Sequence, residues 1–599
     1  MPHCGQKRNY TSIFMAKILK KLFVILDKKQ KRFMVLLVFM MLIGAVLETL
    51  GVSMILPVMN VVMEENAVEK HVYLRWICDF FRIGYSDTRT LMVTVMVGLI
   101  VVFAIKNLFL FIQLKVQMRF VYSNQFATSR RMMINFMKRP YEYYLGADTS
   151  VIQRQITSDV NNMYGMILSI LQLTSEVIVF ICLIIVSLLS DVKMTIMVGT
   201  LLGAVLLIIK CILKPIMIKA GQQNQDYYSG LYKWINEAVT GIKEIKIANK
   251  ENYFINEYSA CGAGYVGAVQ KYNLYNAAPR LLIETIALTG MIIYLLTSLL
   301  GGALMIDIVP QITLLALVAV RLIPCANRIN NYLTSISYYE PFLWNVSDSL
   351  QDEIRDESID YRADTYLKDE EVTKLPIKTS LELKDIVYKY PNTDVYIFDH
   401  ANMEIPIGQS VGIVGTSGAG KTTVVDILLG LLHLEGGSIL SDGKSVLEDY
   451  RSFLKNVGYI PQTIFMTDST IRNNVAFGYA DKDIDDEKVW HALKEAALDE
   501  FVRGLPDGLD TGIGERGIRL SGGQRQRIGI ARALFEDPEV LVLDEATSAL
   551  DNETEAAIMD SINFLHGKKT LIIIAHRLQT IEKCDMVYRV ENGKITRER

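Results

Sequence analysis

The strongest constraint on the fold is a series of six apolar segments within the first 330 of 599 residues. Each is long enough to cross a bilayer as a helix, which takes about 20 residues. A backbone inside lipid must satisfy its own hydrogen bonds, so helices are expected here. The segments lie at 33–63, 91–114, 165–190, 193–214, 274–300 and 304–330. The sequence therefore predicts an α-helical membrane domain with six spans.

The orientation of these spans follows from the N-terminal segment, 1–32, which is rich in lysine and arginine. Basic flanks stay in the cytoplasm. Six crossings then return the C-terminal half to the cytoplasm as well. We expect a multi-pass protein of the cell (inner) membrane with a cytoplasmic C-terminal domain.

The connections between the spans differ in length. Residues 115–164 and 214–273 are polar and helically patterned, and we expect them to extend the spans into the cytoplasm. Their tips, at 140–146 and 234–241, are candidates to rest on the C-terminal domain. On the outside, aromatic and apolar residues recur at helical spacing and predict a short surface helix at about 70–83. It either caps the loop or contacts lipid.

The chain divides into four parts by composition. After the N-terminal segment, the membrane domain is expected at 33–344 and a charged, aperiodic linker at 345–378. From 379 to 599, short apolar strands alternate with helices, which is typical of an α/β domain.

A phosphate-binding loop is the clearest motif of this last domain. Gly415–Thr422 matches G-x-x-x-x-G-K-[ST], with an apolar strand before it and a helical pattern after it. Backbone N–H groups of such a loop wrap phosphates at a helix N-terminus. Lys421 is expected to reach the β- and γ-phosphates, and Thr422 to bind Mg²⁺. The expected ATP contacts are Gly415, Thr416, Ser417, Gly418, Ala419, Gly420, Lys421, Thr422 and Thr423.

Two carboxylates end a second apolar strand, at Asp544 and Glu545. Asp544 suits the Mg²⁺ shell, and Glu545 is then placed to polarise the attacking water as general base. In the alternative interpretation, Glu545 only caps the strand.

Further motifs of this domain resemble the ATP-binding cassette (ABC) family. They are Leu520–Gln524, Gln462 in Tyr-Ile-Pro-Gln, Asp551 in Ser-Ala-Leu-Asp, and His576 in Ile-Ala-His-Arg. The resemblance implies an exporter (type IV) ABC fold with a P-loop nucleotide-binding domain. Residues 514–517, Gly-Glu-Arg-Gly, resemble the exporter loop that contacts the membrane-domain insertions.

The resemblance also implies roles for single residues. Tyr390 stacks on adenine, with Tyr388 as the weaker candidate. Gln462 senses Mg²⁺ and water, His576 touches the γ-phosphate, and Asp551 couples two sites. The signature residues complete the ATP site of the opposite subunit; they are Ser521, Gly522, Gly523 and Gln524.

One cassette and six spans make half a transporter by this resemblance. The simplest assembly is a symmetric homodimer with a second copy of the chain. A heterodimer with another half-transporter is the alternative.

Cations inside the spans suggest what crosses the membrane, because intramembrane charges are costly and usually functional. Arg280, Arg321, Arg328 and Lys106 are expected at the middle or cytoplasmic half of the bilayer. Converging arginines suit an anionic headgroup that carries phosphate. Alternatively, Arg328 snorkels to the interface, Arg280 pairs with Glu284, or Glu48 and Glu176 neutralise the rest.

Over nearly its whole length, the chain resembles the bacterial lipid-linked oligosaccharide flippases of protein N-glycosylation (PglK type). The matching stretches are 278–280, 321–328 and the surface helix before the second span. The resemblance implies that Arg280, Arg321 and Arg328 bind a polyprenyl pyrophosphate. Lys106 is a weaker candidate for the same headgroup site, because it lies within the second span. ATP-driven transfer of a lipid-linked oligosaccharide to the outer leaflet is the function implied.

Two alternatives remain open. One is an exporter of another lipid, a peptide or a drug, although an apolar drug has no need of converging arginines. The other is a regulatory ATPase that gates a partner without transport. A net charge of −3 and the lack of basic tracts give no indication of a nucleic-acid partner, and the six spans exclude a soluble DNA-maintenance cassette.

Overall fold

The computed structural model describes residues 13–53, 72–81, 88–190, 192–300, 305–355, 372–391, 393–544, 565–574 and 581–599. The chain forms two compact units. The helical unit comprises Met1–Met137 and Ala147–Asp356, and the cassette unit comprises Lys138–Gly146 and Glu357–Arg599.

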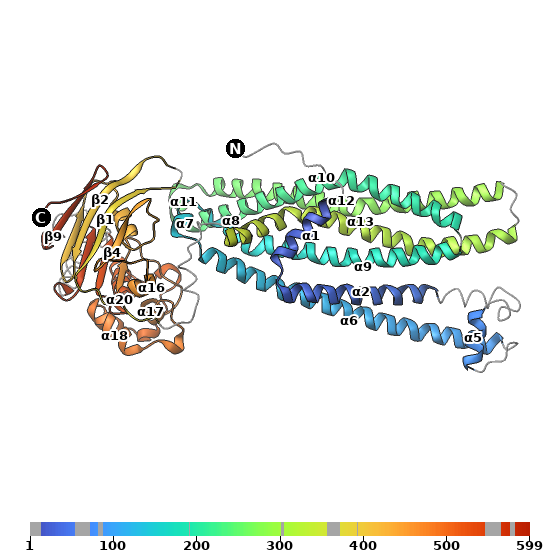
Figure 1. The fold of residues 1–599 in the computed structure, drawn as a ribbon, viewed down its shortest axis with the longest axis horizontal. Helices are drawn as coiled ribbons and strands as arrows, with labels where there is room; N and C mark the ends of the chain where they lie inside the picture. Colours follow the sequence, from blue (N-terminus) through green and yellow to red (C-terminus); the bar gives the residue numbers. More distant parts are fainter. Residues whose placement is uncertain are drawn as a thin grey trace. The chain divides into compact units, whose positions relative to one another are not determined.

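Long helices run side by side through the helical unit (Figure 1). They are α2 (Lys28–Ser53), α6 (Thr88–Met137), α9 (Val160–Ser190), α10 (Val192–Thr240), α12 (Glu251–Leu300) and α13 (Met305–Arg355). α10 packs along α12, while α13 packs along both α9 and α10. Each predicted span falls on one of these helices wherever the structure describes it.

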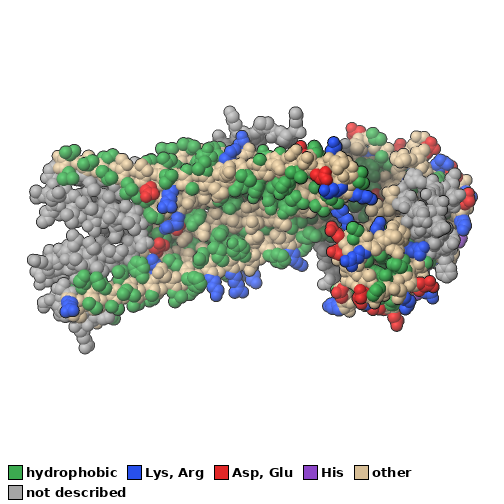
Figure 2. All heavy atoms as spheres, turned by 180° about the vertical axis from the view of Figure 1, so that it is seen from behind, with side chains coloured by type: hydrophobic (Ala, Val, Ile, Leu, Met, Phe, Trp, Pro, Cys, Tyr) green, Lys and Arg blue, Asp and Glu red, His purple; other side chains and the backbone are tan. Residues whose placement is uncertain are grey.

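The surface of the helical unit is suited to lipid. Apolar side chains are spread along the described helices on the face seen in Figure 2, and Lys and Arg gather in a few places between them. Within the described residues, three helical segments are long and apolar enough to cross a membrane: Lys28–Leu50, Arg89–Met137 and Thr149–Ile185. They contain much of the first three predicted spans.

The long helices continue from the predicted spans into the polar insertions. α6 extends past its predicted span to Met137, α10 extends to Thr240, and α12 begins at Glu251. Between them lie short elements: α7 (Tyr141–Gly146), α8 (Thr149–Arg154), the π-helical turn η1 (Gln155–Asp159) and α11 (Ile242–Ala248). α13 runs on to Arg355, so the first part of the expected linker is helical.

Two short helices accompany the spans. α1 (Ile13–Ile25) precedes α2, and α5 (Val72–Phe81) lies within the expected surface helix. On α5, Cys78 is buried while Trp76 and Phe80 are 75% and 76% exposed. Two exposed aromatic side chains are compatible with contact with lipid, and the choice between that role and a structural cap stays a prediction.

The cassette unit contains two sheets. The antiparallel sheet has the order β2-β1-β4-β5, from β1 (Ser380–Lys389), β2 (Tyr396–Pro406), β4 (Gly436–Ser441) and β5 (Lys444–Ser445). The second has the order β10-β9-β3-β8-β7-β6. Its strands are β3 (Ser410–Val414), β6 (Val457–Ile460), β7 (Val540–Asp544), β8 (Thr570–Ile574), β9 (Met586–Glu591) and β10 (Lys594–Arg597). Apart from β10, neighbouring strands of this sheet are parallel.

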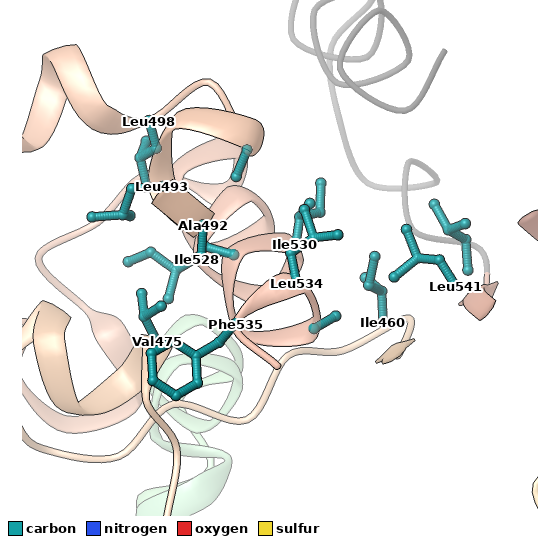
Figure 3. Close-up of a cluster of buried hydrophobic side chains, with 14 of the residues drawn as sticks. Ile460, Val475, Ala492, Leu493, Leu498, Ile528, Ile530, Leu534, Phe535 and Leu541 are labelled. Carbon is teal, nitrogen blue, oxygen red and sulfur yellow. The ribbon is translucent and has the colours of Figure 1, made fainter. Parts of the chain in front are cut away.

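Helices pack against these sheets around two apolar cores. One core joins the sheets to α15 (Lys421–Leu428) and α16 (Tyr450–Leu454). The other joins β6 and β7 to α17 (Ile471–Val475), α18 (Asp486–Glu495) and α20 (Gly522–Leu534), as Figure 3 shows. The short α19 (Asp499–Arg503) adds Val502 to this second core.

One carboxylate, that of Asp442, holds the start of strand β1 in place through hydrogen bonds. Asp442, in the turn after β4, accepts hydrogen bonds from the backbone N–H groups of Lys378, Thr379 and Ser380 and from the Thr379 hydroxyl. Partial burial by itself would raise the pKa of Asp442. The hydrogen bonds outweigh it and lower the pKa to about 2.

Replacing Asp442 by Asn should lower the thermal midpoint of the cassette by a few degrees at pH 7, because an amide has one acceptor oxygen. A depressed carboxyl pKa stabilises the fold above the unfolded pKa of about 3.9. That contribution disappears as pH falls through about 2. Thermal unfolding from pH 7 to pH 2 checks this, with Asp468→Asn as control; an equal loss in both variants would refute it.

Candidate functional site

The phosphate-binding loop has the expected geometry. β3 is fully buried and ends at Val414, directly before the loop, and α15 begins at Lys421. Gly420 caps this helix with φ +101°, a conformation that favours glycine. A Cβ on Gly415 would lie 2.5 Å from the carbonyl oxygen of Val590. The loop therefore requires glycine at both ends.

The side chains of the loop point in different directions. Lys421 is 5% exposed, and its Nζ donates to the carbonyl oxygens of Gly415 and Thr416, both at 3.1 Å. These bonds hold the ammonium over the loop. Thr422 is exposed, whereas Thr423 is buried in the first turn of α15. An exposed hydroxyl on Thr422 is what a metal-bound nucleotide requires.

The two candidate adenine-stacking tyrosines differ in burial. Tyr388 is fully buried in the sheet core. Tyr390 is half-buried, and its hydroxyl lies 2.9 Å from Oγ1 of Thr423. The rings of Tyr388 and Tyr390 pack edge to face, with their centroids 5.3 Å apart. Of the two rings, only that of Tyr390 is partly accessible, and its role as the adenine platform stays a prediction.

Acidic groups gather near the carboxyl end of β7. The strands β3, β8, β7 and β6 are parallel neighbours, so their carboxyl ends share one edge of the sheet. Asp544 ends β7 and accepts a 3.4 Å hydrogen bond from the Tyr459 hydroxyl. Burial, and then the charge of Asp544, raise the pKa of Asp426 to about 6. A site this negative favours a bound cation such as Mg²⁺.

Three other predicted site residues come shortly after the strands that end at this edge. Gln462 comes just after β6 and is exposed. Glu545 directly follows β7, and His576 comes shortly after β8. Glu545, Asp551 and His576 lie outside the described residues, so their predicted roles stay predictions.

The signature sequence forms the start of α20. Ser521 caps the helix through its hydroxyl, which accepts from the Gln524 N–H, and its own N–H donates to Gln524 Oε1 at 2.8 Å. The side chain of Gln524 thus serves the cap. Ser521 and Gly522 are exposed, so the positive end of this 13-residue helix is open to an anion.

α20 and α15 contribute to different cores of the cassette unit. This separation suits a site in which the signature serves a second subunit.

The tip of the first insertion belongs to the cassette unit. Residues Lys138–Gly146, which include α7, cluster with it. The Glu142 carboxylate accepts from the N–H of His433 at 3.0 Å. Burial, and then the charge of Asp426, raise the pKa of Tyr141. The hydrogen bond and the charge of Asp426 both indicate that α7 lies near α15, the helix that follows the phosphate loop.

The helical unit holds a cavity of about 480 Å³ between α12 and α13. Its polar lining comes from Arg280 and Glu284 on α12, and from Asn327, Arg328 and Asn331 on α13. Sequence reasoning did not select the two asparagines. Their spacing of four residues, on the helix that carries Arg328, is the pattern that could have identified them.

The two cavity arginines have different surroundings. Arg328 Nε donates to Glu176 Oε1 at 2.6 Å, a pair that the sequence analysis did not assign. Arg280 is exposed, and among the described residues no carboxylate, Glu284 included, lies within 4.0 Å of its guanidinium. Within the described part of the chain, the cavity thus joins an arginine that has a carboxylate partner, Arg328, and one that has none, Arg280.

The other two predicted cations are less informative. Arg321 lies on α13, but its side chain is outside the described residues. Lys106 is buried, with its Nζ 4.5 Å from the centre of the Phe103 ring, and it is not part of the cavity lining. Its role as a headgroup ligand stays a prediction.

Replacing Tyr390 by Ala should weaken ATP binding about tenfold, because a stacked base is worth about 1–3 kcal/mol. Tyr388→Ala is the control. It should instead lower the free energy of unfolding by about 3–5 kcal/mol through a core cavity. Titration with a fluorescent ATP analogue and chemical denaturation separate the effects. Unchanged ATP affinity in Tyr390→Ala would exclude this ring as the platform.

Two family models match separate parts of the chain. Residues 34–322 match the ABC transporter transmembrane region, and residues 398–548 match the ABC transporter model. The first range lies in the helical unit apart from α7, and the second lies in the cassette unit.

Curated relatives match over a shorter stretch. The ATP-dependent lipid A-core flippase of Idiomarina loihiensis is 43% identical over 213 residues, covering 35% of this chain and 36% of that protein. The flippase of the same name from Escherichia coli K12 is 41% identical over 216 residues, covering 36% and 37%. The chain therefore spans little more than a third of the length of these relatives. The narrower resemblance to oligosaccharide flippases stays a prediction.

A solved structure shares the fold. A bacterial Atm1-family ABC exporter with ATP bound superimposes with a TM-score of 0.73 at 22% identity, covering 95% of both chains. The expected exporter fold is thus confirmed. A membrane region followed by a cassette on one chain, with both family matches in that order, identifies an ABC exporter half-transporter.

Proposed function

We propose that the chain is half of an ATP-driven flippase that moves a polyprenyl-pyrophosphate-linked oligosaccharide from the cytoplasmic to the outer leaflet. The observation that carries the proposal is the cavity lined by Arg280 and Arg328 in the helical unit. Guanidinium groups bind phosphate oxygens in a bidentate manner. Arg280 has no carboxylate partner among the described residues, and such an arginine is suited to an anion that arrives from outside the protein.

The ATPase part of the proposal rests on the cassette. Lys421 and the loop N–H groups hold the phosphates, and Tyr390 stacks on the adenine. The donor set of Thr422, Gln462 and Asp544 consists of oxygen ligands, which fit Mg²⁺. That ion neutralises phosphate charge when it is bound. Glu545 accepts a proton from the attacking water as general base, and His576 contacts the γ-phosphate.

The proposed assembly is a homodimer in the inner membrane, with both cassettes in the cytoplasm. The exposed start of α20 supports it, because Ser521 and Gly522 face solvent within one chain. In the dimer, each signature closes over the ATP of the partner, and Asp551 couples the sites. ATP binding then closes the cassettes, and hydrolysis resets the helical units.

A second candidate substrate is another phosphate-bearing glycolipid. The relatives from Idiomarina loihiensis and Escherichia coli are named lipid A-core flippases. Such a lipid also presents phosphate to the same arginines. Transport assays should therefore compare both lipids in parallel.

Glu545→Gln should bind ATP but hydrolyse it about 100-fold or more slowly, because the general base is lost. In proteoliposomes, the intact protein should move a labelled polyprenyl-pyrophosphate glycan with ATP, and the variant should not. ATP turnover at the normal rate in the variant would remove Glu545 from its role. ATPase activity without movement of either lipid would favour a gating ATPase.

Combined replacement of Arg280 and Arg328 by Ala should lower flipping at least about tenfold, because each charged hydrogen bond contributes about 1.5–3 kcal/mol. Basal ATPase activity should persist, since neither residue lies in the cassette unit. Arg119→Ala, on the exposed side of α6, is the control. Undiminished flipping in the double variant would refute the headgroup site.

A further inference from the structure

We propose that Glu176 is an internal counter-ion that occupies Arg328 until the phosphate of the lipid headgroup replaces it. The inference rests on the proposed anionic substrate. It adds a positioning residue on α9 that does not itself line the cavity, and it makes headgroup binding an exchange of one anion for another.

The geometry of the pair leaves Arg328 available. Its Nε donates to Glu176 Oε1 at 2.6 Å, and the side chains are 42% and 17% exposed. Because the carboxylate contacts Nε and Arg328 lines the cavity, the pair aims the guanidinium toward the headgroup space. Glu176 thereby sets the direction of Arg328 while partly neutralising it.

Glu176 is itself held in place by a second contact. The thiol of Cys325 donates to Glu176 Oε2 at 3.2 Å and lies 3.4 Å from the Glu176 carbonyl oxygen. Cys325 and Arg328 are three residues apart on α13, so they share one face of the helix. Both carboxylate oxygens thus have a partner on the same helix, and the carboxylate keeps one partner when it releases Arg328.

Glu176 also balances the positive charge of Arg328 when no headgroup is bound. Among the described residues around the cavity, Glu176 and Glu284 match Arg280 and Arg328 in number, and the charge of Glu48 also acts on Arg328. An uncompensated arginine within a membrane is costly. Glu176 removes that cost between transport cycles. After the headgroup leaves, the carboxylate can take back Arg328, which favours release.

Glu176→Gln should separate binding from turnover. Without the competing charge, farnesyl pyrophosphate should bind about tenfold more tightly. Release should slow, so KM and kcat of lipid-stimulated ATPase should both fall. A residue that only supports the fold would raise KM or leave it unchanged. Cys325→Ala removes the partner that the carboxylate keeps when it releases Arg328, so it should weaken farnesyl pyrophosphate binding, by a smaller factor than Glu176→Gln strengthens it.

A chemical probe tests the pair independently of any substrate. In the purified full-length protein, phenylglyoxal should modify Arg328 faster in Glu176→Gln than in the unaltered protein, as quantified by peptide mass spectrometry. Modification of Arg280 serves as the internal reference, and Glu257→Gln as the matched control. Farnesyl pyrophosphate, compared with inorganic pyrophosphate, should protect Arg328.

The outcomes distinguish two kinds of failure. Equal modification of Arg328 with and without Glu176, or weaker farnesyl pyrophosphate binding by Glu176→Gln, would overturn the counter-ion. Faster modification, with no binding of farnesyl pyrophosphate by either protein, would overturn the proposed substrate while supporting the pair. Faster modification together with tighter binding and slower turnover supports both.

Discussion

Backbone hydrogen bonding in lipid is the constraint on which the rest of the structure depends. Segments that enter a bilayer must form helices, because no water is present to satisfy free N–H and C=O groups. In this protein the helices do not stop where the apolar sequence stops. α6, α10 and α12 continue through polar residues as single rigid rods. A movement at one end of such a helix is therefore carried along its length.

In the cassette unit, a mostly parallel sheet brings residues that are distant in sequence to one edge. Its strands deliver the phosphate loop after β3, Asp544 at the end of β7 and Gln462 after β6 to one edge. Side chains far apart in sequence thereby meet where a nucleotide can bind. α7 also belongs to this unit, through Glu142 and Tyr141. Within the cassette unit, this six-residue helix lies beside α15.

Charge within the helical unit follows the cost of burying ions. Arg328 has a carboxylate partner, while Arg280 faces the cavity without one among the described residues. A paired cation is inexpensive to keep in a membrane, and an unpaired one is useful to a ligand. The combination is consistent with the proposed anionic headgroup.

The sequence by itself determined the membrane-spanning class, the α/β cassette and the identity of the phosphate-loop residues, because periodicity and local motifs carry that information. Tertiary structure alone decided which tyrosine is accessible: Tyr388 is buried by strands distant in sequence, and Tyr390 is not. It also decided that Glu176, on α9, pairs with Arg328, and that Lys106 lies away from the cavity lining. The end of α13 at Arg355 was likewise hidden, since charged residues suit a linker and a solvated helix equally. Burial and ion pairing depend on which helices pack together, and a single sequence does not specify that packing.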